Sequence, residues 1–201
     1  MPNGTPEIPR PESPLLILGG TFDPPHIGHL VLAECARVQF AASRVVFVPA
    51  GDPYRKTGRH VSSAHHRLAM VRLAIADNPA FAIDEREVRR DGPTYTVETL
   101  EELRAEGHAH IVLILGADAV EDMPQWKHPG RIRELATLAV APQDTQSAGL
   151  PGYLTVDMPP LSISSTLIRN RVASGRPIRY LTTDSVARYV AEHGLYRSPA
   201  P

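Results

Sequence analysis

Two histidines, His26 and His29, lie three residues apart in the segment GGTFDPPHIGH, which runs from Gly19 to His29. An apolar run, Leu15–Leu18, precedes this segment, and an amphipathic stretch follows from Ile27. The order predicts a strand, a tight glycine turn and the start of a helix. The N–H groups of such a turn and the positive end of the helix suit a phosphate. Because side chains three apart in a helix are neighbours, both imidazoles can reach one anion. The pattern indicates phosphoryl or nucleotidyl chemistry.

A turn-rich segment with two adjacent cations, Arg55 and Lys56, follows a second apolar run, Val45–Val48. On its own such a segment is most simply a solvated surface loop. Its place at the end of a strand, beside the histidine segment, favours a basic loop that closes over the outer phosphates of a nucleotide. Lys56 is the candidate for that contact.

A second phosphate signal lies in the segment SISSTLIR, which ends at Arg169. Ser164 or Ser165 is a suitable N-cap for the helix that follows. The hydroxyls and N–H groups at that helix start, together with the Arg169 guanidinium one turn later, could bind an anion. The alternative is an ordinary capped helix with an exposed arginine.

Composition limits the classes of protein that remain. The chain has 201 residues, 42% of them hydrophobic, and a net charge of −1, which gives no electrostatic case for binding nucleic acid or a membrane surface. Its one cysteine, Cys35, excludes an internal disulfide or a cysteine zinc site and is expected to pack in a helix. No signal peptide or membrane-length apolar run is present, so we expect a cytoplasmic protein. Residues 1–13 and 198–201 are expected to be flexible tails.

The apolar runs alternate with amphipathic stretches, which predicts an α/β fold with a doubly wound parallel sheet and right-handed crossovers. We expect a single domain over residues 14–197, whose part from about residue 164 is a small helical subdomain. Predicted strands are Leu15–Leu18, Val45–Val48, Ile111–Leu115, Leu138–Val140 and Leu154–Val156. Predicted helices are Ile27–Phe40, Ala64–Ala76, Val97–Glu106, a short one around Arg131–Leu135, Ser165–Ser174 and Asp184–His193. Ligands of such sheets bind beyond the carboxyl ends of the strands, so three motifs should converge there: Gly19-Gly20, the segment after Val48, and Gly116-Ala117-Asp118.

The GGTFDPPHIGH segment resembles the signature of the H-x-G-H nucleotidyltransferase superfamily. From about Leu15 to Arg197 the chain looks like the bacterial nicotinate mononucleotide adenylyltransferase family. The resemblance is carried by the segments RLAMVRLAIAD, DEREVRR, PTYTVETL, ILGADA, MPQW, ISSTLIR and GLYR. It implies a Rossmann-like fold and transfer of the adenylyl group of ATP to nicotinate mononucleotide, with release of pyrophosphate. A Mg²⁺ ion would be carried by ATP and water, without a metal site made of protein ligands.

The resemblance also implies roles for individual residues. Catalytic roles fall to His26, His29, Lys56 and Arg169. Contacts to ATP and its phosphates fall to Gly19, Gly20, Thr21, Phe22, Gly116, Asp118, Ser165 and Thr166.

Two segments bear on the acceptor. Trp126 is the only tryptophan and lies between Pro124 and Pro129, outside any periodic apolar face, so it either stacks on a flat ring or packs its loop. Tyr95 and Thr96 precede a helix whose first N–H groups either bind a carboxylate or are merely capped. The resemblance implies that Thr96 binds the nicotinate carboxylate through its backbone and that Trp126 stacks on the ring.

Three alternatives stay open. The acceptor could be nicotinamide mononucleotide or phosphopantetheine. The chain could also be a nucleotide-sensing module that keeps the fold without turnover. The intact histidines, lysine and arginine argue against such a module. The chain also departs from the family, with Ala141-Pro142-Gln143 where Arg-Pro-Gly is frequent and Arg55 where a histidine is frequent. Assembly into a homo-oligomer is compatible with the sequence.

Overall fold

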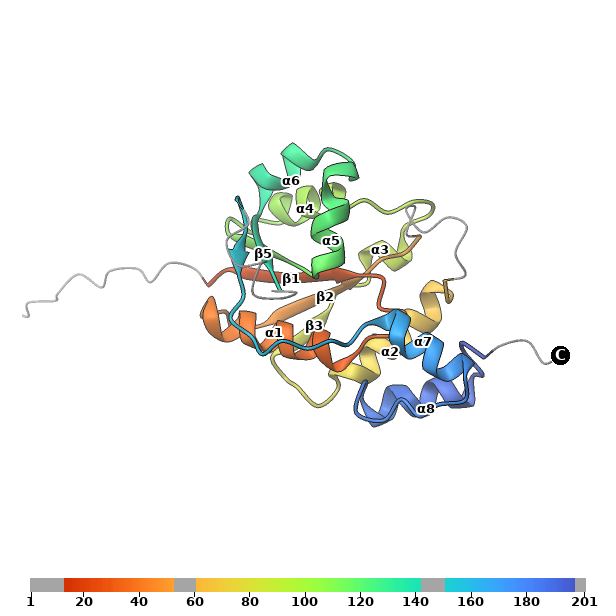
Figure 1. Cartoon of the computed structure of the whole chain (residues 1–201). Helices are drawn as coiled ribbons and strands as arrows, with labels where there is room; N and C mark the ends of the chain where they lie inside the picture. The colour runs from red at the N-terminus through yellow and green to blue at the C-terminus, as the bar shows by residue number, and fades with distance from the viewer. Residues whose placement is uncertain (1–12, 53–60, 142–150, 198–201) are drawn as a thin grey trace, which may run out of the picture.

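One parallel sheet of six strands organises the protein, in the order β3-β2-β1-β4-β5-β6 in this computed structural model (Figure 1). The structure describes residues 13–52, 61–141 and 151–197. Every neighbouring pair of strands is parallel. The strands are β1 (Leu15–Gly20), β2 (Val45–Pro49), β3 (Phe81–Ile83), β4 (Ile111–Leu115), β5 (Thr137–Val140) and β6 (Leu154–Thr155).

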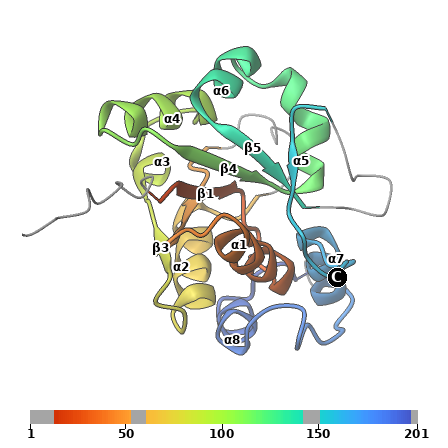
Figure 2. The same ribbon diagram turned by 90° about the vertical axis from the view of Figure 1, so that its left-hand side faces the viewer.

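Helices cover both faces of the sheet, as Figure 2 shows. One face is packed by α1 (Ile27–Gln39) and α2 (Ala64–Ile75), and the other by α4 (Thr96–Ala105) and α6 (Pro129–Leu135). The remaining helices are α3 (Arg86–Arg89), α5 (Ala117–Asp122), the 3₁₀ turn η2 (Met123–Gln125), α7 (Ser165–Ala173) and α8 (Asp184–Glu192).

The strands place alternate side chains in two separate cores. In β1, Leu16 and Leu18 join the cluster beneath α1 and α2, whereas Ile17 joins the cluster beneath α4 and α6. All five residues of β4 are buried. Continuous apolar strands of this kind are typical of a parallel sheet covered on both faces. Cys35 is half-buried against the first cluster, as predicted, and burial raises the pKa of its thiol.

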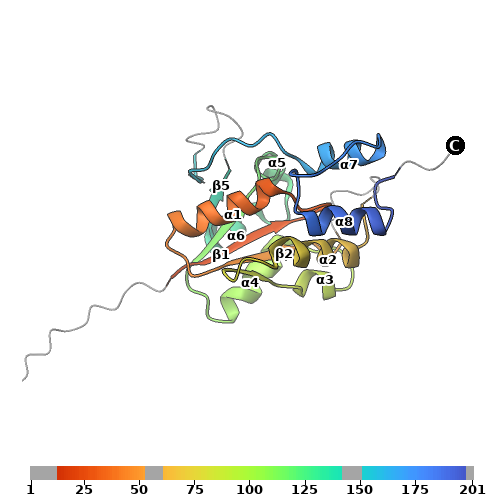
Figure 3. The ribbon, with the colours of Figure 1, turned by 90° about the horizontal axis from the view of Figure 1, so that it is seen from below.

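The last two helices form a third, smaller core with α2. Ile168 of α7, Val186 and Val190 of α8 and Met70 of α2 are buried together. Seen from below, α8 lies alongside α2 (Figure 3). The C-terminal helices are therefore joined to the sheet through α2.

The predicted fold class, five strands and six helices are confirmed, with small shifts at their ends. Strand β3 and the short helices α3 and α5 were not predicted. The division into a domain and a helical subdomain stays a prediction, and residues 1–12 and 198–201 lie outside the described residues. Within the described part of the chain, no helix is long and apolar enough to span a bilayer.

Candidate active site

The candidate site lies where β1, β2 and β4 end side by side. Strand β1 pairs with β2 on one side and with β4 on the other, and the Ala50 N–H continues the β2 pairing by donating to the Gly20 carbonyl at 2.9 Å. The sheet order reverses between β1 and β4, the position at which open α/β sheets bind ligands. The predicted convergence is thus confirmed for Gly19-Gly20, for residues 49–52 of the segment after Val48, and for Gly116.

The two glycines are the last residues of β1, so the predicted glycine turn is wrong in detail. The chain changes direction at Phe22, a buried residue with φ of 52°. A Cβ on Gly20 would lie 3.1 Å from the Phe22 ring. Gly20 therefore makes room for this aromatic ring, which in turn packs edge-on against the His29 imidazole at 5.0 Å between centroids.

The His26 and His29 rings are stacked, with centroids 3.6 Å apart and an angle of 25° between planes. The His26 backbone N–H donates to His29 Nδ1 at 3.1 Å. A neutral imidazole that accepts at Nδ1 carries its proton on Nε2. His29 is thereby fixed in the tautomer that presents an Nε2–H donor at the first turn of α1.

His26 is held neutral by its surroundings. Burial lowers the pKa of its imidazole to about 4. Its Nδ1 is buried and has no hydrogen-bond partner among the residues that the structure describes. A Cβ on Gly28 would lie 3.0 Å from that nitrogen, so the glycine of the His-x-Gly-His pattern leaves space for the His26 ring.

The C-terminal helices hold the loop that leads to these histidines. Three successive carbonyls, those of residues 23–25, accept hydrogen bonds at 2.8 Å from Arg169 Nη1, Ser165 Oγ and Thr182 Oγ1 in turn. Arg169 also donates from Nη2 to the Thr166 hydroxyl at 3.0 Å. The predicted phosphate contacts of Ser165, Thr166 and Arg169 stay predictions. In the structure, Ser165 and Arg169 also hold the histidine loop through these hydrogen bonds. Ser164 is the N-cap, since its Oγ accepts from the Leu167 N–H at 3.1 Å.

Two buried polar residues near the site were not singled out from the sequence. The Asp23 carboxylate accepts from the Tyr196 hydroxyl at 2.6 Å and from the Ser62 N–H at 3.2 Å. Burial and the neighbouring carboxylate raise the pKa of Tyr196. The Arg67 guanidinium, on a residue 1% exposed, donates to four backbone carbonyls, those of Thr21, Ala50, Gly51 and Ser62.

The predicted acceptor residues lie at the start of α4 and in the loop before α6. Tyr95 is the N-cap residue and Thr96 begins the helix. Trp126 is half-buried and packs against the same apolar cluster as Tyr95. The neighbouring Lys127 has its ammonium 4.1 Å from the Tyr95 ring centroid and donates to Glu98 at 2.7 Å. The Trp126 loop is therefore fastened to the first turn of α4.

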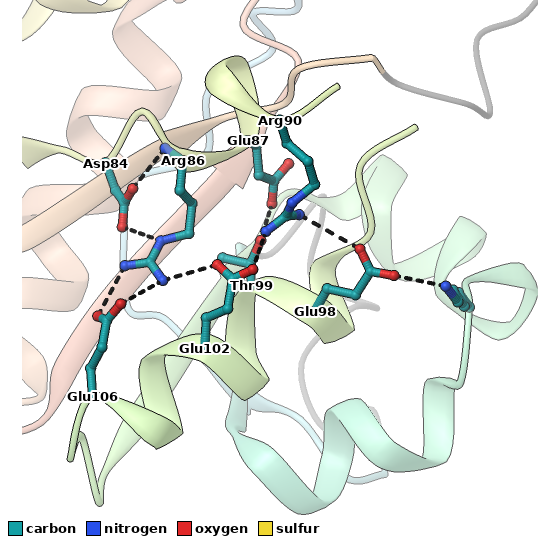
Figure 4. A network of polar contacts seen from close by, with 9 residues as sticks. Asp84, Arg86, Glu87, Arg90, Glu98, Thr99, Glu102 and Glu106 are labelled. Carbon is teal, nitrogen blue, oxygen red and sulfur yellow. Dashed lines mark hydrogen bonds and ion pairs between the residues drawn. The ribbon is translucent and has the colours of Figure 1, made fainter. Parts of the chain in front are cut away.

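A network of charged side chains fixes α4 in its place (Figure 4). Arg90 contacts Glu102 at 2.6 Å and Glu98 at 3.7 Å, and Glu98 links this arginine to Lys127. Arg86 connects Asp84 with Glu102 and Glu106. Beneath them the Thr99 hydroxyl donates to the buried Glu87 carboxylate at 2.7 Å, whose pKa is raised by burial.

The start of α4 is also tied to the segment after β2. The Thr94 N–H donates to the Asp52 carbonyl at 3.2 Å. A Cβ on Gly51 would lie only 2.0 Å from the Glu87 carbonyl oxygen, so no other residue fits there without moving backbone. The acceptor segment and the loop beyond β2 are thus held at one edge of the sheet.

Some predicted residues fall outside this description. Arg55 and Lys56 lie within residues 53–60, and Pro142 and Gln143 within residues 142–150, which are not among the described residues. Gly116 caps α5 directly after β4, and Asp118 is the second residue of that helix. Within the described ranges, no group of three or more histidine, cysteine, aspartate or glutamate side chains gathers as a metal site.

Comparison of this chain with known proteins identifies its family. The family model described as cytidylyltransferase-like matches residues 17–171. A relative from Roseiflexus sp. (strain RS-1), named "Probable nicotinate-nucleotide adenylyltransferase", is 46% identical over 196 residues, covering 92% of this chain and 98% of the relative. A relative of the same name from Thermomicrobium roseum is 46% identical over 198 residues, covering 92% of each chain.

Solved structures share the fold. The nicotinic acid mononucleotide adenylyltransferase of Plasmodium falciparum, solved with NaAD, superposes with a TM-score of 0.75 over 92% of this chain and 97% of that one, at 18% identity. The same enzyme with APC gives a TM-score of 0.72. With a family model that covers most of the chain and relatives 46% identical over nearly its whole length, the protein belongs to the nicotinate-nucleotide adenylyltransferase family of cytidylyltransferase-like proteins.

Proposed function

We propose that this protein transfers the adenylyl group of ATP to nicotinate mononucleotide, which gives nicotinate adenine dinucleotide and pyrophosphate. The observation that carries the proposal is the stacked pair His26–His29 at the start of α1, in a chain whose relatives carry the name of this enzyme at 46% identity. The nucleotide would lie over the ends of β1 and β4, with its phosphates at the start of α1.

The reaction requires an acceptor phosphate oxygen to attack the α-phosphorus of ATP in line while the bond to pyrophosphate breaks. The nucleophile is already an anion, so no strong general base is needed. Negative charge develops on the non-bridging and leaving oxygens, and fixed donors there lower the barrier. We assign this task to His29, whose Nε2–H is fixed by the bond at Nδ1. His26, Arg169 and Lys56 complete the proposed catalytic set.

A Mg²⁺ ion would neutralise charge on the triphosphate when bound. We expect the ion to be held chiefly by phosphate oxygens and water. The residues of this chain would then act on the same phosphates by donating hydrogen bonds, with Gly19, Gly20, Thr21 and Phe22 on the nucleotide side.

The acceptor would bind at the start of α4. Thr96 is the first residue of that helix, and the N–H groups of a first helical turn have no partner within the helix and favour a carboxylate. Trp126, half-buried in the adjacent loop, would stack on the pyridine ring. A site built for a carboxylate rejects the amide because charge and hydrogen-bond donors both differ.

The decisive assay measures pyrophosphate release from ATP and Mg²⁺ with nicotinate mononucleotide, nicotinamide mononucleotide and phosphopantetheine in parallel. The proposal predicts a strong preference for the first acceptor. A preference for the amide would keep the chemistry and remove the carboxylate contact at Thr96. Turnover with phosphopantetheine alone, or with none of the three, would refute the proposed reaction.

A further inference from the structure

A buried arginine side chain lies behind the two segments that follow β1 and β2. Arg67, on α2, is 1% exposed. Its Nη1 donates to the Thr21 carbonyl at 2.9 Å and to the Ala50 carbonyl at 2.6 Å, and its Nη2 donates to the Gly51 carbonyl at 2.6 Å. Burial lowers the pKa of the Arg67 guanidinium. Its hydrogen-bond partners given by the structure are backbone carbonyls rather than carboxylates.

These bonds fix the direction of the peptide groups that they involve. In a trans peptide the C=O and the following N–H point in opposite directions. The Thr21 and Ala50 carbonyls point at the buried guanidinium, so the Phe22 and Gly51 N–H groups point away from it. Neither N–H donates to an acceptor among the described residues.

We propose that Arg67 is a positioning residue that turns the Phe22 and Gly51 N–H groups toward the crevice, where they bind phosphate oxygens. A guanidinium suits this task because its planar fork serves several carbonyls at fixed angles, which a lysine ammonium cannot do. The cation also polarises the peptides whose carbonyls it binds, which strengthens their N–H groups as donors. This inference deepens the proposed function, on which it rests for the identity of the phosphate ligand.

Arg67→Lys tests this role against a plain structural one, with Arg72→Lys as the matched control. Arg72 lies on the same helix with a side chain that is 59% exposed and pairs with Glu85, so its substitution should leave all readouts unchanged. Pyrophosphate and adenosine serve as separate ligands for the two halves of ATP. For Arg67→Lys we expect pyrophosphate affinity to fall about tenfold or more while adenosine affinity changes less than about twofold. Equal losses for both ligands would overturn the proposal.

A measurement on the unaltered protein covers the case in which Arg67→Lys does not fold. Pyrophosphate is added to ¹⁵N-labelled protein, and the amide signals of Phe22 and Gly51 are followed by NMR. The proposal predicts large downfield shifts at both amides that saturate together. Saturable binding without a shift at either amide would refute it. Because this titration needs no acceptor and no turnover, it separates failure of the Arg67 role from failure of the proposed reaction.

Discussion

The two nitrogens of His29 have different tasks, and two substitutions separate them. Nδ1 accepts the His26 N–H at 3.1 Å, whereas the Nε2–H is assigned to the reacting phosphates. In His29→Asn the amide oxygen can take the place of Nδ1, but nothing reaches the Nε2 position. In His29→Gln the amide nitrogen reaches toward the Nε2 position, and the acceptor for the backbone is lost. Both variants lose the ring contacts with His26 and Phe22 equally, so their difference isolates the hydrogen bonds.

The expected magnitudes follow from the two interactions. Removal of an oxyanion donor costs about 10²–10³ in kcat, so His29→Asn should lose that much activity. Removal of a hydrogen bond at a helix start costs about 1 kcal/mol, which corresponds to a Tm about 2–4 °C lower for a chain of this size. His29→Gln should therefore be the less stable of the pair and the more active one.

The assay combines steady-state pyrophosphate release with thermal unfolding of both variants. The reasoning would be refuted if His29→Asn were at least as active as His29→Gln. It would also fail if the asparagine variant were the less stable of the two, because the Nδ1 contact would then have no role in holding the turn.

Three further outcomes are expected. The pKa of His26 is about 4 in the folded protein against an ordinary 6.5, so the unfolded chain takes up the proton first, and the free energy of unfolding should fall by roughly 1–3 kcal/mol as the pH drops from 6.5 through 4. Denaturant titrations of the unaltered protein and of His26→Gln at pH 7 and pH 5 measure this fall. An equal change of the unfolding free energy with pH in both proteins would contradict it. Gly28→Ala places a Cβ 3.0 Å from His26 Nδ1 and should lower kcat about tenfold to a hundredfold, whereas Gly130→Ala, where a Cβ meets nothing within 4 Å, should not. Trp126→Ala should raise the acceptor KM far more than the ATP KM, with Trp126→Phe intermediate; equal rises in both KM values would place Trp126 outside the acceptor pocket.

The sequence predicted the long elements of this fold and failed on the short ones. Strands such as Ile111–Leu115 are continuous apolar runs, and their burial on both faces leaves a clear pattern. Strand β3 has three half-buried residues at the edge of the sheet, and α3 has four residues. Segments this short contain fewer than two periods of the strand or helix pattern, so hydrophobic periodicity cannot identify them.

The site could be predicted where a local motif carries it, and not where distant groups meet. His26 and His29 lie in one segment and were found together. Arg67 donates to a carbonyl 46 positions away, and Tyr196 to a carboxylate 173 positions away. The partners of Arg67 are backbone carbonyls, which every residue has, so no residue type in the sequence marks that contact. A charged residue on a helix is ordinarily expected at the surface, and Arg67 departs from that expectation.

The hydrogen bonds between the C-terminal part of the chain and the carbonyls of residues 23–25 have a consequence for biosynthesis. The carbonyls that set the course of the histidine loop are bound by residues 141 to 157 positions later in the chain. A ribosome that has made the sheet has therefore not yet made the groups that shape the loop in front of it. Turnover should begin late, when α7 and the segment before α8 have left the exit tunnel and docked, so that chains halted before that point are inert rather than partly active.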